Sequence, residues 1–190
     1  MSQATVPAMR PELFLLTEEG KGFELVNGEL EEKPVSALSS FVGAQVNRVI
    51  GNYIARLNLG LVFQSDCSYQ CFPHEPGRIR RPDGSFIRQE RVTPELLAEG
   101  HVTEAPDWVQ ETVSLHETAY ETEAKVDDYL RAGVKLIWVI HPEVRTVHVY
   151  RSDGSVSRLR EGDVLSGEAV FPGFACPVAE LFPPVAAAKT

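Results

Sequence analysis

The sequence has no long hydrophobic run and only three cysteines, and each shortage excludes a class of protein. No window approaches the roughly 18 consecutive apolar residues that a membrane span requires. The first ten residues lack the basic and then apolar pattern of a signal peptide, so we expect a cytoplasmic protein that does not associate with membranes. An odd number of cysteines in a chain of 190 residues argues against a disulfide framework.

Common metal and catalytic signatures are also missing. Cys67, Cys71 and His74 lie close together, but a structural zinc site usually needs a second ligand pair, and the sequence has none. The five histidines show no ligand spacing, and we expect them at the surface or in strands. The chain has no GxxxxGK[ST], GxGxxG, GxSxG or HExxH motif.

Basic residues are scarce relative to acidic ones. The 18 lysines and arginines face 27 aspartates and glutamates, which gives a net charge of −9. Proteins that bind nucleic acid without sequence preference are usually basic, because neutralising phosphates supplies most of that affinity. One local exception is the cluster of Arg78, Arg80 and Arg81. It could contact a phosphate backbone, although a solvated loop is the simpler interpretation.

The hydrophobic pattern predicts one α+β domain with a mixed β-sheet over residues 21–182, between a loosely held N-terminal arm (1–20) and a C-terminal tail (183–190). Asn27-Gly28 between two apolar runs predicts a first hairpin. Apolar spacings of three and four predict a helix over 36–57, capped by Ser36 or Ser39. The pattern then predicts, in order, strands at 61–64, 67–72 and 82–88, a loop or short helix near 94–99, a strand at 107–113, a helix at 117–132, a buried strand at 136–140, and a meander of antiparallel strands at 146–150 and 156–160.

Two acids stand out within this pattern. Asp83 begins a predicted strand, and Glu111 lies inside a strand that is otherwise rich in apolar residues. Two carboxylates at adjacent strand ends could ligate Mg²⁺, which takes one or two carboxylates and keeps several waters. The residues alone leave simpler alternatives open: Asp83-Gly84 is a common turn dipeptide, and Glu111 could lie on a solvated face of the sheet.

Several segments together resemble the Uma-two-type family of putative restriction endonucleases, within the PD-(D/E)XK nuclease superfamily. The matching segments are 23–30, 81–83, 106–114, 125–129, 133–134, 137–142, 172–174 and 181–182, and they cover about residues 20 to 182. Each motif is weak alone, but their order and spacing are specific. The resemblance implies a restriction-endonuclease-like mixed sheet flanked by helices.

The resemblance also implies roles for individual residues. Asp83 and Glu111 would be catalytic acids that bind Mg²⁺ or Mn²⁺. The lysine that usually stands two residues after the second acid is replaced by Val113, and Lys125 matches a lysine that the family carries on the following helix. Tyr129 lies four residues later and shares the same helix face, as a supporting residue.

The first hairpin would add a further acid, Glu29, with Glu24 as the second choice. Without the resemblance, Lys125 would be interpreted as a solvated helix charge paired with Glu121. The chain departs from the family at three positions: Ser39 replaces a histidine, Gly84 an apolar residue, and His141 an acidic residue.

These features support three hypotheses. The first is a metal-dependent endonuclease that hydrolyses DNA phosphodiesters, with a homodimer as an expected assembly because duplex-cutting nucleases of this fold often pair. The second is a non-catalytic interaction or nucleic-acid-binding module, which the net charge of −9 suits better. The third is a hydrolase for a smaller phosphate compound, for which the chain has no positive motif. Metal-dependent cleavage would separate the first hypothesis from the second.

Overall fold

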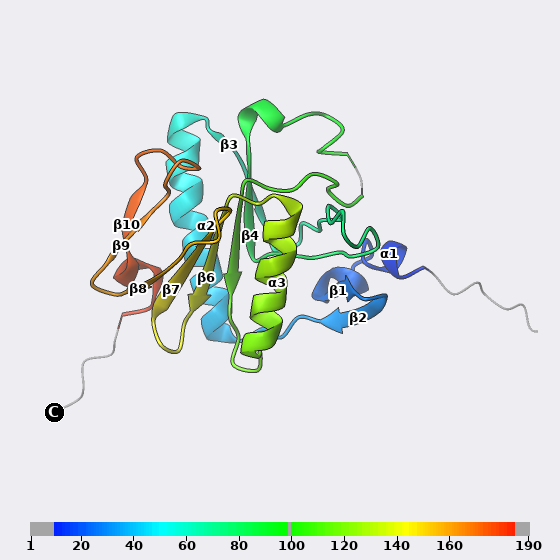
Figure 1. The fold of residues 1–190 in the computed structure, drawn as a ribbon, viewed down its shortest axis with the longest axis horizontal. Coiled ribbons are helices and arrows are strands. Elements are labelled where there is room, and N and C mark those ends of the chain that lie inside the picture. The colour runs from blue at the N-terminus through cyan, green and yellow to red at the C-terminus, as the bar shows by residue number, and fades with distance from the viewer. Residues whose placement is uncertain (1–9, 99, 185–190) are drawn as a thin grey trace, which may run out of the picture.

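A six-stranded mixed sheet forms the centre of the protein (Figure 1). The computed structural model describes residues 10–98 and 100–184. The parallel pair lies in the middle of the sheet, and all other neighbours are antiparallel. The strands, in the order in which they lie across the sheet, are β3 (Gly60–Gln64), β4 (Gly84–Arg88), β5 (Trp108–Thr112), β6 (Leu136–His141), β7 (Thr146–Arg151) and β8 (Val156–Arg160).

One long helix covers each face of the sheet. Helix α2 (Ala37–Leu57) packs on the face that carries Trp108, and helix α3 (Ala119–Ala132) packs on the face that carries Val109. Alternate residues of β5 therefore face opposite helices. Ser36 caps α2 in a capping box with Ser39, as the sequence predicts. Helix α3 connects the parallel strands β5 and β6, and it lies over the face to which Glu111 belongs, because Tyr129 of α3 contacts Glu111.

The strand directions bring the two predicted acids to the same end of the sheet. Strand β4 starts at Gly84 and runs antiparallel to β5, which pairs Gly84 with Gln110. Asp83, immediately before β4, therefore lies beside the carboxyl end of β5, where Glu111 is located.

The N-terminal segment is more ordered than the sequence suggests. Residues 11–22 form α1 (Pro11–Phe14) and the short 3-10 helix η1 (Glu19–Gly22), and Leu15 is buried against Leu25 and Ile79. A loosely held arm is thus wrong for this part, and residues 1–9 lie outside the described residues. The predicted hairpin is confirmed as β1 (Phe23–Val26) and β2 (Glu29–Glu32), with positive φ at Asn27 and Gly28.

Other segments also differ from the expectation. Residues 67–72 were expected as a strand but make isolated bridges, in which Tyr69 pairs with Arg80 and Val102. Beyond the confirmed meander, Phe171 and Phe174 pack into the core on the α2 side. The smaller elements are η2 (Gln89–Arg91), β9 (Val164–Ser166), β10 (Ala175–Pro177) and η3 (Val178–Leu181). Among the described residues, no helix has the length and apolar content to cross a membrane.

Candidate active site

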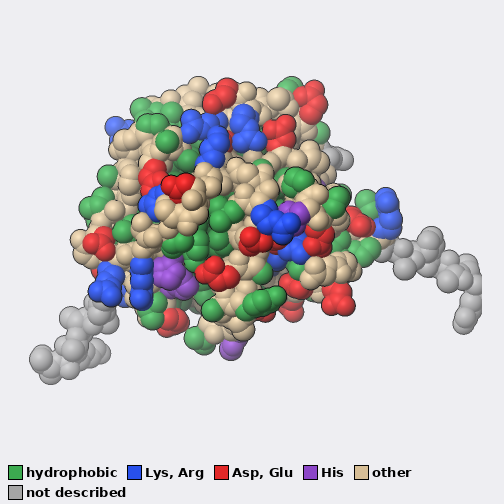
Figure 2. Space-filling view, viewed as in Figure 1, with side chains coloured by type: hydrophobic (Ala, Val, Ile, Leu, Met, Phe, Trp, Pro, Cys, Tyr) green, Lys and Arg blue, Asp and Glu red, His purple; other side chains and the backbone are tan. Residues whose placement is uncertain are grey.

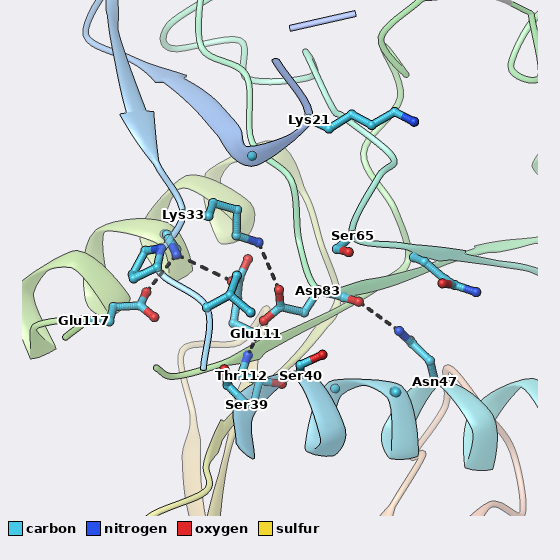
Figure 3. A pocket seen from close by; sticks show the side chains of 17 residues that line it. Lys21, Lys33, Ser39, Ser40, Asn47, Ser65, Asp83, Glu111, Thr112 and Glu117 are labelled. Atoms are coloured by element: carbon cyan, nitrogen blue, oxygen red, sulfur yellow. Dashed lines mark hydrogen bonds and ion pairs between the residues drawn. The ribbon is translucent and has the colours of Figure 1, made fainter. Parts of the chain in front are cut away.

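A pocket of about 250 Å³ opens where the starts of β4 and α2 meet the end of β5 (Figure 3). Asp83, Glu111 and Lys125 all line it. The structure therefore brings together the two predicted acids and the predicted lysine, which come from the residue before β4, from β5 and from α3. Glu117, Lys33 and Lys21 complete the charged wall around them.

Asp83 is held by contacts on both carboxylate oxygens. Its Oδ2 accepts a hydrogen bond from the backbone N–H of Thr112 at 2.7 Å, and its Oδ1 accepts one from Lys33 Nζ at 3.0 Å. Asn47 on α2 donates its side-chain N–H to the Asp83 carbonyl at 2.9 Å. The turn interpretation of Asp83-Gly84 is wrong, because Gly84 is a strand residue paired with Gln110.

The glycine after Asp83 has a steric cause. A Cβ at Gly84 would lie 2.2 Å from Asn47 Oδ1 and 2.8 Å from Gln110 Oε1, closer than real Cβ contacts allow. Gly84 therefore makes room for the Asn47 side chain that binds the Asp83 carbonyl.

Glu111 is buried beneath α3 with only 3% of its surface exposed, so the expectation of a solvated strand face is wrong. Its Oε1 accepts a hydrogen bond from Tyr129 O–H at 2.7 Å, and its Oε2 lies 3.7 Å from Lys125 Nζ. Burial raises the pKa of the Glu111 carboxyl to about 7, although the ammonium groups of Lys125 and Lys33 act in the opposite direction.

Lys125 points into the site and is also buried. Its Nζ donates a hydrogen bond to Glu117 Oε1 at 2.7 Å in addition to facing Glu111. Burial alone would lower the pKa of Lys125, but the carboxylates of Glu111, Glu24 and Glu117 raise it above its usual value. Pairing with Glu121 is wrong, since Glu121 caps α3 by accepting hydrogen bonds from Thr118.

The two hairpin acids differ in position. Glu29 is exposed at the start of β2 and does not line the pocket. Glu24 is buried, and its carboxylate accepts hydrogen bonds from the backbone N–H of Arg81 at 2.7 Å and from Arg80 at 2.9 Å. Burial would raise the pKa of Glu24, but Lys125 and the neighbouring cations lower it to about 2. Glu24 is therefore an ionised partner of the site's cations.

The arginine cluster is not a solvated loop, because Arg80 and Arg81 are only 3% and 2% exposed. Arg80 donates to Glu24 and to Asp128, and Arg78 also pairs with Asp128. Arg81 donates to main-chain carbonyls from three separate segments. The donors proposed for phosphate contacts are thus engaged inside the fold.

Lys33 is the site residue that sequence reasoning missed. It follows β2, and its Nζ donates to the Arg81 carbonyl as well as to Asp83. Burial would lower the pKa of Lys33, but Asp83 and Glu111 raise it above the usual value. The sequence signal is weak: Lys33-Pro34 follows a run of glutamates, and only the return of the hairpin towards α2 places it at Asp83.

The donor set fits a hard divalent cation. Asp83 and Glu111 offer carboxylate oxygens, and Mg²⁺ commonly takes one or two carboxylates and keeps several waters. Within residues 10–98 and 100–184, no group of three or more histidine, cysteine, aspartate or glutamate side chains could hold a metal ion. A cation here would therefore rely on the acid pair and on water.

Comparison with known proteins agrees with this fold. The model of the Uma2 family, described as "Putative restriction endonuclease", matches residues 10–179. The fold is similar to the crystal structure of a putative nuclease belonging to DUF820 from Anabaena variabilis, with a TM-score of 0.75 and 20% sequence identity, over 92% of this chain and 97% of that one. No curated protein matches the chain.

Proposed function

Because the chain belongs to the Uma2 family of restriction-endonuclease-like proteins, we propose that it is a metal-dependent endonuclease that hydrolyses phosphodiester bonds in DNA. One observation carries the proposal: Asp83, Glu111 and Lys125 line a single pocket at the end of the central strands. Each is also fixed by a specific contact: Thr112 holds Asp83, Tyr129 holds Glu111, and Glu117 holds Lys125.

Asp83 and Glu111 would hold Mg²⁺ or Mn²⁺, which when bound would polarise a phosphoryl oxygen and make a water molecule more acidic. Tyr129 donates its hydroxyl to Glu111 Oε1 and so leaves Oε2 towards Lys125. Lys125 would place a positive charge beside the charge that develops on the phosphate. The Thr112 N–H sets the orientation of Asp83.

Local charge explains how an acidic protein could accept a phosphodiester. The pocket wall carries three carboxylates, from Asp83, Glu111 and Glu117, and three ammonium groups. A divalent cation would therefore give the pocket an excess of positive charge. Figure 2 shows small groups of basic side chains interspersed with acidic ones on the face that α3 covers. The attraction for phosphate would thus be local and would depend on the metal.

The experiment is a cleavage assay on plasmid, single-stranded and branched DNA with Mg²⁺ or Mn²⁺. We expect cleavage that chelation stops and that Asp83→Asn lowers by at least about a hundredfold, since this substitution removes a charged ligand. Asp127→Asn, on the exposed side of α3, is the matched control. Cleavage that survives Asp83→Asn would refute the proposed site.

A non-catalytic nucleic-acid-binding module is the second candidate. The observation that favours it is the neutralisation of the acids by the chain itself, since Lys33 contacts Asp83 and Lys125 faces Glu111. Such a pocket does not require a metal ion to balance the charge of its acids. Gel shifts of DNA that are insensitive to chelation, together with no cleavage, would support this candidate over the nuclease.

A further inference from the structure

Lys33 lies between two cavities and lines both of them. It follows β2, immediately before the turn into α2, and its side chain lines the pocket of Asp83. It also lines a second cavity of about 640 Å³ between the first hairpin and α3. The Lys33 side chain therefore forms part of the wall that separates the two spaces.

The ammonium of Lys33 takes up one of the two oxygens of Asp83. Nζ lies 3.0 Å from Oδ1, while Oδ2 accepts the N–H of Thr112 (Figure 3). Only 12% of the Lys33 side chain is exposed, so water screens this ion pair poorly. Each oxygen of Asp83 therefore already has a partner, and the partner of Oδ1 is a cation.

We infer that Lys33 is a competitor for the metal at Asp83, so that a divalent cation binds only as the Lys33 ammonium leaves Oδ1. This inference rests on the proposed function and identifies a residue that regulates the same site. The Lys33 ammonium and a divalent cation would bind the same oxygen, Oδ1 of Asp83. Two cations at contact distance repel strongly in a poorly solvated pocket.

The second cavity has space for the Lys33 side chain after it leaves Asp83. Glu31 and Glu32 line that cavity, and both are exposed on β2. A Lys33 side chain that leaves Asp83 can turn towards these carboxylates or towards a phosphate in the first pocket. Lys33 is therefore a positioning residue. Its ammonium group binds the Asp83 carboxylate in the absence of the metal and moves away from Oδ1 when the metal binds.

The test measures Mn²⁺ binding by the electron paramagnetic resonance of free Mn²⁺, without DNA. Lys33→Met keeps much of the side-chain volume but removes the charge, and we expect a dissociation constant on the order of tenfold lower than that of the wild type. Lys21→Met is the charge-matched control, because Lys21 lines the same pocket but pairs with Glu18. Its effect should be much smaller. Adding Asp83→Asn to Lys33→Met should abolish the gain.

A second measurement uses the wild-type protein, in case Lys33→Met does not fold. The side-chain ¹⁵N resonance of Lys33 should shift as Mg²⁺ is added, with the same midpoint as metal binding. Equal Mn²⁺ affinity of the wild type and Lys33→Met, weaker binding by Lys33→Met, or an unmoved Lys33 resonance under saturating metal would each overturn the inference alone. No metal binding by the wild type or Lys33→Met would overturn both the inference and the proposed nuclease.

Discussion

Replacing Glu111 by glutamine should stabilise the folded protein at high pH while removing a proposed metal ligand. Burial raises the pKa of this carboxyl to about 7, above its usual value of 4.5. When folding raises the pKa of a group, the contribution of that group to stability is fully present at a pH below its pKa in the unfolded chain. The contribution is lost as the pH rises through the pKa in the folded protein. Above neutral pH, the ionised Glu111 therefore destabilises the fold, and an amide does not ionise.

The size of the effect follows from the two pKa values. Their difference of about 2.5 (about 7 minus 4.5) corresponds to roughly 3 kcal/mol at 1.36 kcal/mol for each pKa unit. The amide oxygen can still accept the Tyr129 hydroxyl, but Lys125 loses one of its two anionic partners, which reduces the gain. We expect a net stabilisation of about 1 to 3 kcal/mol, or about 2 to 10 °C in melting temperature.

The assay is urea unfolding of the wild type and Glu111→Gln from about pH 4 to about pH 9, in chelator. The free-energy difference should be smallest near pH 4 and grow through neutral pH. Glu29→Gln is the control because Glu29 is exposed on β2, and its difference should stay near zero. A difference that does not change with pH, or a wild type that is more stable than Glu111→Gln at high pH, would refute the reasoning.

Two further substitutions test buried charge elsewhere. Asp128→Asn should lower the free energy of unfolding in urea by about 3 to 5 kcal/mol, because it leaves the buried Arg80 guanidinium with one anionic partner fewer. The exposed Asp127→Asn is the control. A decrease of less than about 1 kcal/mol for Asp128→Asn would contradict the argument. Burial lowers the pKa of His141 from its usual 6.5 to about 4, so the contribution of His141 to stability should be full above about pH 6.5 and should decline towards pH 4. His141→Gln should remove on the order of 1 kcal/mol of that decline, whereas the exposed His116→Gln should leave the pH profile unchanged.

Local chemistry made most of the fold predictable from the sequence. Asn27-Gly28 sets the first hairpin because both residues accept positive φ, and Gly133 ends α3 for the same reason. Ser36 begins α2 through a cap that is local in the sequence. The unexpected parts depend on distant partners. Tyr69 forms isolated bridges with two separate segments, and Leu15 packs in one cluster with Ile79, which lies far along the chain.

The candidate site was predictable where strand pattern and family spacing agreed. They selected Asp83, Glu111 and Lys125, which the structure brings into one pocket. Lys33 was missed, and the burial of Arg81 was not expected, because these features depend on ion pairs and carbonyl contacts between residues about 50 or more positions apart. From the sequence alone, a charged residue in a polar segment is interpreted as solvated. Its burial becomes evident only when the fold shows the distant residue with which it pairs.

The buried charges behind the pocket explain why α3 can hold its two site residues in place. Asp128 on α3 binds Arg80, and Arg80 binds Glu24 on the first hairpin. This chain of ion pairs connects the helix to the hairpin, and Lys125 and Tyr129, which contact Glu111, are on the same helix. A substitution at Asp128 should therefore disturb the geometry at Glu111 without touching the pocket. Measuring both metal affinity and the free energy of unfolding in such a variant would distinguish residues that position the site from residues that bind the metal.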